Sequence, residues 1–206
     1  MKVLIINGSP RTNGNTSTAL REMEKIFESE SVEYEQIQIG GKSIAGCCAC
    51  GRCSDIGRCV FDDEVNKAVS LLEECDGMVI GSPVYYSMPN GSLVSFLQRL
   101  FYSSHSVDKT MKVGAVVVAA RRAGTTASFD VLNKFFTISQ MPVVSGQYWN
   151  NVFGREEGEC TQDDEGLQNA RVVARNMVFL MKAIRDAKEN YGLPQKEART
   201  ATNFIR

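Results

Sequence analysis

"INGSPRTNGNTST", residues 6–18, is the stretch that decides the fold. It follows the apolar run 3–6, which is short and rich in β-branched residues, as expected of a strand covered on both faces. It leads into residues 15–28, where apolar side chains recur at helical spacing. The pattern predicts a strand, a tight turn and a helix, with glycine, asparagine, hydroxyl groups and one arginine crowded into the turn.

Strand and helix patterns then alternate along the chain. We expect further strands at 32–39, 76–82, 112–120 and 141–146, and further helices at 62–74, 90–102, 125–139 and 163–189. Such alternation predicts an α/β fold, a doubly wound five-stranded parallel sheet with helices on both faces. One domain is expected over residues 1–190, with a cysteine-rich loop at 40–61. Residues 191–206 lack periodicity and are expected to form a tail that becomes ordered against a partner subunit.

Composition narrows the function classes. The 206 residues suit one domain, and a hydrophobic fraction of 43% can fill its core. The net charge is −1 and no long run of either sign occurs, so we expect no nucleic-acid partner and no anionic membrane. The first apolar run stops too early for a signal peptide, and the run at 113–120 is far below the roughly 18 residues of a membrane helix. A cytoplasmic location is expected.

The chemistry of the first turn indicates a phosphate. A helix N-terminus offers free backbone N–H groups and partial positive charge, and small residues let the backbone approach an anion. The nucleoside-triphosphate loop needs lysine where Asn15 stands, and the dinucleotide pattern G-x-G-x-x-G is absent from the turn. The turn therefore suits one phosphate monoester. An ordinary turn with helix capping by Asn13 or Asn15 remains the alternative.

Two later loops are expected at the same sheet edge, "GSPVYYSMPNGSLVSFLQRL" (81–100) and "AARRAGTTAS" (119–128). The Pro-Val-Tyr-Tyr stretch offers a stiff backbone and flat apolar side chains, which suit a planar heterocycle. The same tyrosines are also compatible with a core or interface role.

Three motifs, "GSPRTNGNT", "GSPVYYSMPNGSLVSFLQR" and "GRCVFDDE", resemble the flavodoxin-like NAD(P)H-dependent FMN reductase superfamily, and within it the iron–sulfur flavoproteins. The resemblance spans about residues 1–185. It implies strand order 2-1-3-4-5, bound FMN, NAD(P)H as substrate and assembly as a homodimer or homotetramer.

By position, the resemblance implies three groups of FMN-binding residues. The phosphate would be held by Ser9, Arg11, Asn15, Thr16 and Ser17. The isoalloxazine ring would be bordered by Pro83, Val84, Tyr85, Tyr86 and Met88, and closed at its other edge by Ala120, Arg121 and Gly124. No catalytic side chain is expected, because the flavin carries the redox chemistry itself.

Five of the seven cysteines lie within residues 47–59. The spacing Cys47-x2-Cys50-x2-Cys53-x5-Cys59 supplies four thiolates for one 4Fe-4S cluster, as in the iron–sulfur flavoproteins. Open alternatives are a register that starts at Cys48, a zinc site, a reactive dithiol and cysteines without metal.

The function predicted from these features is an FMN-dependent oxidoreductase. It would accept hydride from NAD(P)H, or electrons from a reduced carrier, and pass them through the cluster to a small molecule or small redox protein. Three alternatives remain: a quinone or FMN reductase without a cluster, a flavodoxin-type electron carrier, and a cluster-based redox sensor. The net charge of −1 argues against the carrier, because flavodoxins are strongly acidic.

Overall fold

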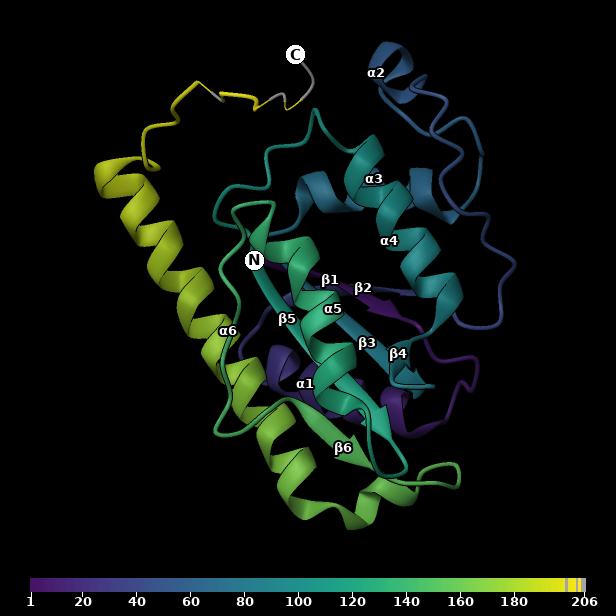
Figure 1. Cartoon of the computed structure of the whole chain (residues 1–206). Helices are drawn as coiled ribbons and strands as arrows, with labels where there is room; N and C mark the ends of the chain where they lie inside the picture. The colour runs from purple at the N-terminus through teal and green to yellow at the C-terminus, as the bar shows by residue number, and fades with distance from the viewer. Residues whose placement is uncertain (199, 203, 205–206) are drawn as a thin grey trace.

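A computed structural model describes residues 1–198, 200–202 and 204. Its central feature is a sheet with the strand order β2-β1-β3-β5-β6, in which all neighbouring strands run parallel (Figure 1). A short strand β4 pairs antiparallel with the end of β3. The strands are β1 Lys2–Asn7, β2 Glu33–Gln38, β3 Gly77–Tyr85, β4 Met88–Pro89, β5 Val113–Ala120 and β6 Asn151–Phe153. The predicted flavodoxin-like α/β fold is confirmed, and its five parallel strands lie in the predicted order, with β6 in the fifth place.

Helices cover both faces of the sheet (Figure 1). One face carries α1 (Asn15–Ser29) and α6 (Asp164–Tyr191). The other carries α3 (Glu64–Glu74), α4 (Gly91–Ser103) and α5 (Thr125–Thr137). Two short turns of helix, α2 (Cys53–Ile56) and a 3₁₀ turn (Glu159–Gln162), lie in loops.

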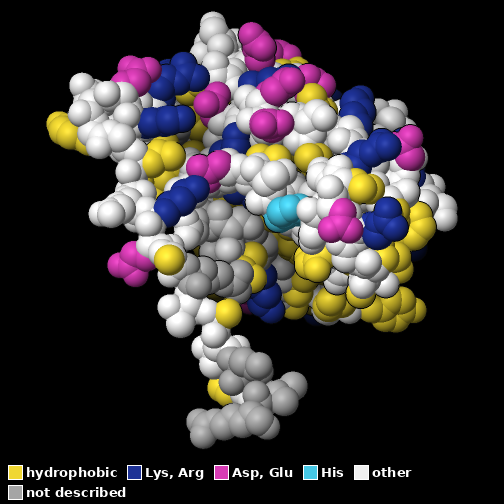
Figure 2. All heavy atoms as spheres, turned by 90° about the horizontal axis from the view of Figure 1, so that it is seen from above, with side chains coloured by type: hydrophobic (Ala, Val, Ile, Leu, Met, Phe, Trp, Pro, Cys, Tyr) yellow, Lys and Arg dark blue, Asp and Glu magenta, His cyan; other side chains and the backbone are white. Residues whose placement is uncertain are grey.

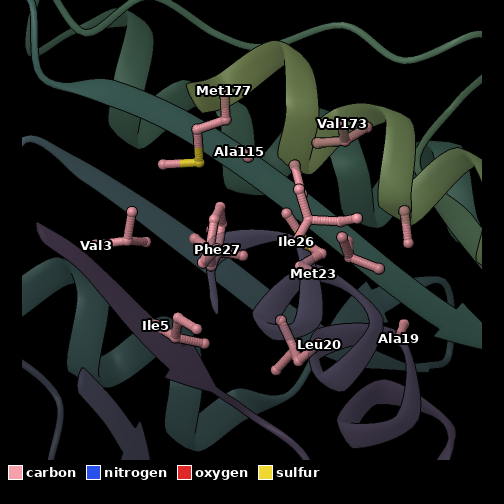
Figure 3. Packing of buried hydrophobic residues seen from close by; sticks show 14 of the residues in the cluster. Val3, Ile5, Ala19, Leu20, Met23, Ile26, Phe27, Ala115, Val173 and Met177 are labelled. Carbon is pink, nitrogen blue, oxygen red and sulfur yellow. The ribbon is translucent and has the colours of Figure 1, made fainter. Parts of the chain in front are cut away.

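Strand β1 shows why its sequence is continuously apolar. Val3 and Ile5 belong to the core beneath α1 and α6, while Leu4 and Ile6 belong to the core beneath α3, α4 and α5. Figure 3 shows Val3 and Ile5 on the side of the sheet that Phe27 occupies. Because successive side chains of a strand point to opposite faces, a strand buried on both faces needs an apolar residue at every position.

The predicted strand at 141–146 is wrong. Pro142 has no N–H to donate, and the segment makes only an isolated bridge between Val143 and Gly114. The chain then leaves the sheet, and the Asn169 side chain of α6 hydrogen-bonds the backbone of residues 147–149 in place of a neighbouring strand. The fifth parallel strand is β6, which pairs with the end of β5.

The described part of the tail, residues 192–198, 200–202 and 204, contains no helix or strand. Lys196 nonetheless pairs with Asp108 of the same chain at 2.8 Å. The order expected against a partner stays a prediction, and residues 199, 203 and 205–206 lie outside the described part. None of the described helices is long and apolar enough to cross a membrane. On the face shown in Figure 2, basic and acidic side chains are interspersed.

Gly114 provides a test of the packing between β5 and α5. A Cβ at this position would lie 2.5 Å from the ring of Phe136, so Gly114→Ala should destabilise the fold by about 1–3 kcal/mol. Gly91→Ala is the matched control, because its Cβ would meet no atom within 4 Å at the first position of α4. Urea unfolding should show a lower midpoint for Gly114→Ala alone, and equal midpoints would contradict this packing.

Candidate functional site

A cleft of about 200 Å³ opens at the carboxyl ends of the parallel strands, where ligands bind in folds of this kind. It gathers the first turn, the end of β3, the end of β5 and the loop after β6. Its lining residues are Ser9, Arg11, Gly14, Asn15, Thr16, Pro83, Val84, Tyr85, Ala119, Ala120, Arg121, Gly154 and Arg155.

Side-chain hydrogen bonds shape the first turn. Asn7, the last residue of β1, accepts from the backbone N–H of Ser9 at 3.0 Å and donates to the Ser17 hydroxyl at 2.9 Å. The Ser17 hydroxyl in turn donates to the carbonyl of Arg11 at 3.2 Å, and Gly14 N–H donates to the same carbonyl at 3.1 Å. The turn is therefore held by its own polar residues before any ligand binds.

Helix α1 begins at the cleft without a side-chain cap. Gly14 is its N-cap residue, and no side chain of the described residues caps the helix. The first N–H groups of a helix lack acceptors within the helix, and the helix dipole adds partial positive charge there. The guanidinium groups of Arg11, Arg121 and Arg155 add full charges around the same cleft. This end of the cleft is suited to an anion.

The end of β3 turns back into β4 through a two-residue hairpin. Tyr86 and Ser87 both have positive φ, 50° and 60°, as in type I′ turns, although neither is glycine. Such backbone is unfavourable for residues with a side chain and persists only where the surroundings hold it. The turn places Tyr85 at the cleft and leaves Tyr86 fully exposed.

Gly124 holds that hairpin from the neighbouring loop. It has φ +92°, and a Cβ on it would lie 2.7 Å from the Cα of Ser87. Both the backbone conformation and the close approach therefore require glycine. Gly124 supports the hairpin from outside and does not line the cleft.

The loop after β6 supplies residues that the sequence analysis missed, above all Arg155. The Asn15 amide donates to the carbonyl of Glu156 at 3.0 Å and accepts from the N–H of Cys160 at 3.0 Å. The Arg11 guanidinium reaches the carbonyl of Arg155 at 3.5 Å. Asn15 therefore ties this loop to the first turn. The signal was the segment "GRE" (154–156), which directly follows β6 at the ligand edge. The prediction of the fifth strand at 141–146 instead of 151–153 obscured it.

Most of the predicted flavin residues share the cleft, but four do not line it. Ser17 is buried and hydrogen-bonds Asn7. Tyr86 and Met88 are exposed on the hairpin, and Gly124 lies behind it. The residues in the cleft that were not predicted are Gly14, Ala119, Gly154 and Arg155.

The cysteine loop begins beside the first turn. The N–H groups of Ile39 and Gly40 donate to the carbonyl of Asn7 at 2.8 and 3.2 Å. A Cβ on Gly40 would lie 1.9 Å from the carbonyl carbon of Ser9, so this position admits only glycine. The start of the loop is thereby packed directly against the turn at the cleft.

All five cysteines of the loop, Cys47, Cys48, Cys50, Cys53 and Cys59, line one small cavity of about 20 Å³. All seven cysteines of the chain, each within the described residues, are free. Among the described side chains, no three Cys, His, Asp or Glu converge in a metal-binding arrangement. The thiols therefore face one space without forming a preassembled ligand set.

Local hydrogen bonds favour the charged form of one thiol in the loop, Cys50, and of the Arg99 guanidinium, which contacts the loop from α4. A backbone hydrogen bond from Arg52 lowers the pKa of the Cys50 thiol. Burial acts against the charge of Arg99, but its hydrogen bonds to Asp63 and Cys59 outweigh burial and raise the pKa of the guanidinium. The two cysteines outside the loop are held as neutral thiols by burial, which raises the pKa of Cys160 and raises the pKa of Cys75 to about 11.

Comparison with known proteins gives a consistent result. Residues 1–155 match the family described as NADPH-dependent FMN reductase. An iron-sulfur flavoprotein of Methanocaldococcus jannaschii is 31% identical over 192 residues, which cover 90% of this chain and 100% of the relative. An NADPH azoreductase of a Bacillus species is 25% identical over 189 residues, which cover 89% of this chain and 92% of the azoreductase.

Solved structures show the same fold. An NAD(P)H:quinone oxidoreductase from Methanothermobacter marburgensis aligns with a TM-score of 0.66 at 14% identity, over 86% of this chain and 96% of its own. An archaeal flavodoxin aligns with a TM-score of 0.59 at 15% identity, over 88% and 99%. At such low identity the likeness concerns the fold alone.

The role of Asn15 as a tie gives a prediction. Asn15→Leu removes both amide hydrogen bonds to the 154–160 loop, which together contribute about 1 kcal/mol or more. Trypsin should then cleave after Arg155 about fivefold faster. Asn13→Leu is the control, because Asn13 lies exposed in the same turn and accepts only from Arg21. Equal cleavage rates in the two variants would rule out the tie.

Proposed function

The chain belongs to the family of NADPH-dependent FMN reductases, and from this premise we propose that its cleft binds FMN. The ligand would lie with its phosphate at the first turn and its ring toward the β3–β4 hairpin. The observation that carries the proposal is an uncapped helix N-terminus that shares one cleft with three arginines and the hairpin.

The phosphate would be held mainly by backbone groups and by charge. The N–H groups at Asn15 and Thr16, at the start of α1, would donate to the phosphate, while the side chain of Asn15 remains bound to the 154–160 loop. Arg11 and Arg155 supply guanidinium donors beside them. Ser9 lies at the same end of the cleft. Ser17 contributes through the turn, because its hydroxyl holds the carbonyl of Arg11.

The ring would lie between two loops. Pro83, Val84 and Tyr85 offer one apolar border, and Ala120 and Arg121 the other. Tyr86 and Met88 stand exposed at the hairpin, where a nicotinamide or an electron acceptor would approach. Gly124 keeps the hairpin at its place.

The chain's own task in this reaction is binding and orientation. When bound, FMN would supply the redox chemistry, that is, acceptance of a hydride equivalent from NADPH and transfer of electrons to an acceptor. The protein must hold nicotinamide against the ring, exclude water and offer backbone donors to developing negative charge. No side-chain acid or base is required of the chain, because the flavin carries the redox chemistry itself.

The second part of the proposal is a 4Fe-4S cluster on Cys47, Cys50, Cys53 and Cys59. Supporting it are the four thiols around one cavity, the arginine beside one of them, and the name of the relative from M. jannaschii. The donor chemistry fits a cluster, although the thiols must draw together to bind it. When bound, the cluster supplies one-electron transfer, so the protein would pass electrons singly to a small redox partner.

A cluster-free NADPH:quinone or FMN reductase is the competing proposal. It is favoured by the thiols that do not converge among the described residues. In that case the acceptor would take electrons directly at the exposed hairpin.

A reduction experiment tests the first proposal. FMN-reconstituted protein should be bleached by NADPH under anaerobic conditions, followed by stopped-flow absorption of the flavin band. Arg155→Gln should weaken FMN binding by about tenfold, because a charge-assisted hydrogen bond contributes about 1.5 kcal/mol or more. Arg171→Gln removes the same charge from an ion pair with Glu22 on α1 and should leave FMN affinity unchanged. Protein that binds FMN but is not reduced by NADPH or NADH would instead be an electron carrier.

Iron analysis tests the cluster. Protein purified anaerobically should contain iron and acid-labile sulfide, with broad absorption beside the flavin bands. Serine substitution of Cys47, Cys50, Cys53 or Cys59 should each abolish this signal, because serine does not replace a thiolate ligand. Cys48→Ser should keep it. Wild-type protein without iron would leave the cluster-free reductase.

A further inference from the structure

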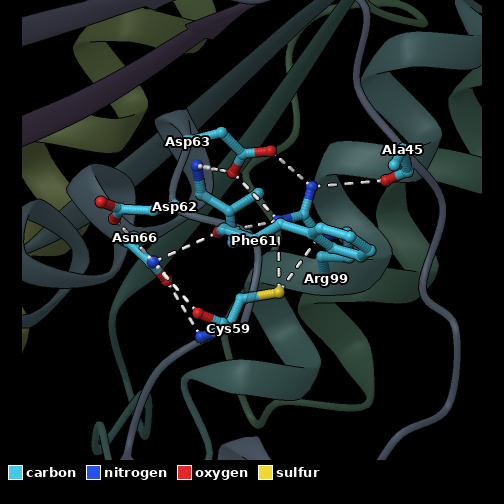
Figure 4. Close-up of polar contacts among 8 residues, drawn as sticks. Ala45, Cys59, Phe61, Asp62, Asp63, Asn66 and Arg99 are labelled. Atoms are coloured by element: carbon cyan, nitrogen blue, oxygen red, sulfur yellow. Dashed lines mark hydrogen bonds and ion pairs between the residues drawn. The ribbon is translucent and has the colours of Figure 1, made fainter.

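Arg99 is a buried charge that the proposed reaction does not use. It projects from α4, and its side chain is 1% exposed. A buried guanidinium is tolerated only when its N–H donors meet acceptors. Figure 4 shows the acceptors: two oxygens of Asp63 at 2.6 and 3.0 Å and the carbonyls of Phe61 and Ala45 at 3.2 and 3.4 Å.

The remaining partner of Arg99 is the sulfur of Cys59. Nε and Nη2 donate to this Sγ at 3.3 and 3.2 Å. A thiol sulfur is a weak acceptor, whereas a cysteine sulfur bound to metal carries negative charge and accepts well. Two guanidinium donors on one sulfur therefore suit a sulfur in a metal centre. The Phe61 ring, 4.8 Å from the Arg99 guanidinium carbon, holds the guanidinium from one side.

Helix α4 connects the contact between Arg99 and Cys59 to the β3–β4 hairpin. At its start, Asn90 caps the helix by accepting from Leu93 N–H, and its own N–H donates to the Ser82 hydroxyl on β3. Arg99 follows nine residues later, which is about 14 Å along a helix axis. The same rigid element thus holds the hairpin at one end and the Cys59 sulfur toward the other.

We propose that Arg99 is a positioning residue of the cysteine loop: from α4, it fixes the Cys59 sulfur and raises the reduction potential of the cluster proposed on Cys59. The second half rests on the proposed cluster. Reduction adds one electron to the cluster and so adds negative charge to its sulfur ligands. N–H donors aimed at those sulfurs stabilise the added charge and favour the reduced form.

A purely structural role is the alternative to be excluded. Arg99 also binds the backbone at Ala45 and Phe61, so its loss would loosen the loop whatever Cys59 does. A test therefore needs readouts that follow the sulfur contact itself.

The first readout needs no cluster. In the full-length chain without iron, the Arg99 Nε–H gives a side-chain NMR signal that Arg99→Lys identifies by its loss. This N–H donates to Cys59 Sγ, so Cys59→Ala should speed its exchange with water at least fivefold. Cys50→Ala, elsewhere in the same cavity, should leave it unchanged. Equal exchange in wild type and Cys59→Ala would overturn the positioning role.

The second readout is the cluster potential in anaerobic holoprotein, followed by EPR during a redox titration. The variant Arg99→Met/Asp63→Asn removes the ion pair without leaving the half-buried Asp63 carboxylate unpaired, and the asparagine amide oxygen can still cap α3 as the Asp63 carboxylate does. Its equilibrium constant for one-electron reduction should fall about tenfold, a potential about 59 mV more negative. Arg171→Gln should leave the potential at its wild-type value.

The outcomes separate the two proposals. An unchanged potential in the double variant overturns the tuning by Arg99 and leaves the cluster intact. Wild-type protein without iron overturns the cluster proposal, and the tuning with it, while the Nε–H exchange still decides whether Arg99 positions Cys59.

Discussion

The carboxyl end of β1 is tied to both neighbouring segments, and the rest of the site depends on this constraint. Gly8 N–H donates to the Gly81 carbonyl of β3 at 2.8 Å, and Ile39 and Gly40 donate to the Asn7 carbonyl from the end of β2. Parallel pairing brings all three strand ends to one edge. The first turn, the β3–β4 hairpin and the start of the cysteine loop each directly follow one of these strands. Pairing of the strand ends therefore makes the three segments adjacent.

Two different kinds of support surround this edge. At the first turn, neutral side chains such as Asn7, Asn15 and Ser17 hold the backbone in place and leave the N–H groups of helix α1 and the arginines of the cleft free of these contacts. On the cysteine side, an ion pair between the buried Arg99 guanidinium and the half-buried Asp63 carboxylate holds the loop at greater electrostatic cost. The charged anchor offers N–H donors to the Cys59 sulfur, whereas the neutral anchors leave the positive field of the cleft intact.

The elements that the sequence predicts well are those whose signal is local. The apolar run of β1, the helical spacing of α1 and the turn between them all appear within a few residues of their predicted bounds. The strand at 141–146 is the informative error. Its apolar pattern is real, but Pro142 and the contacts of Asn169 on α6 divert the chain, and the ladder resumes only at β6.

For the candidate site, the sequence by itself singled out three segments: the first turn and the aromatic stretch after the third strand, which both line the cleft, and the cysteine loop, whose five cysteines line one cavity. Tertiary structure alone decided what holds them. Arg155 reaches the cleft because Asn15 binds a loop 141 residues further on, and Arg99 meets Cys59 across 40 residues. Such partners cannot be read from spacing, because periodicity reports which face a residue occupies and not which distant side chain the fold brings against it.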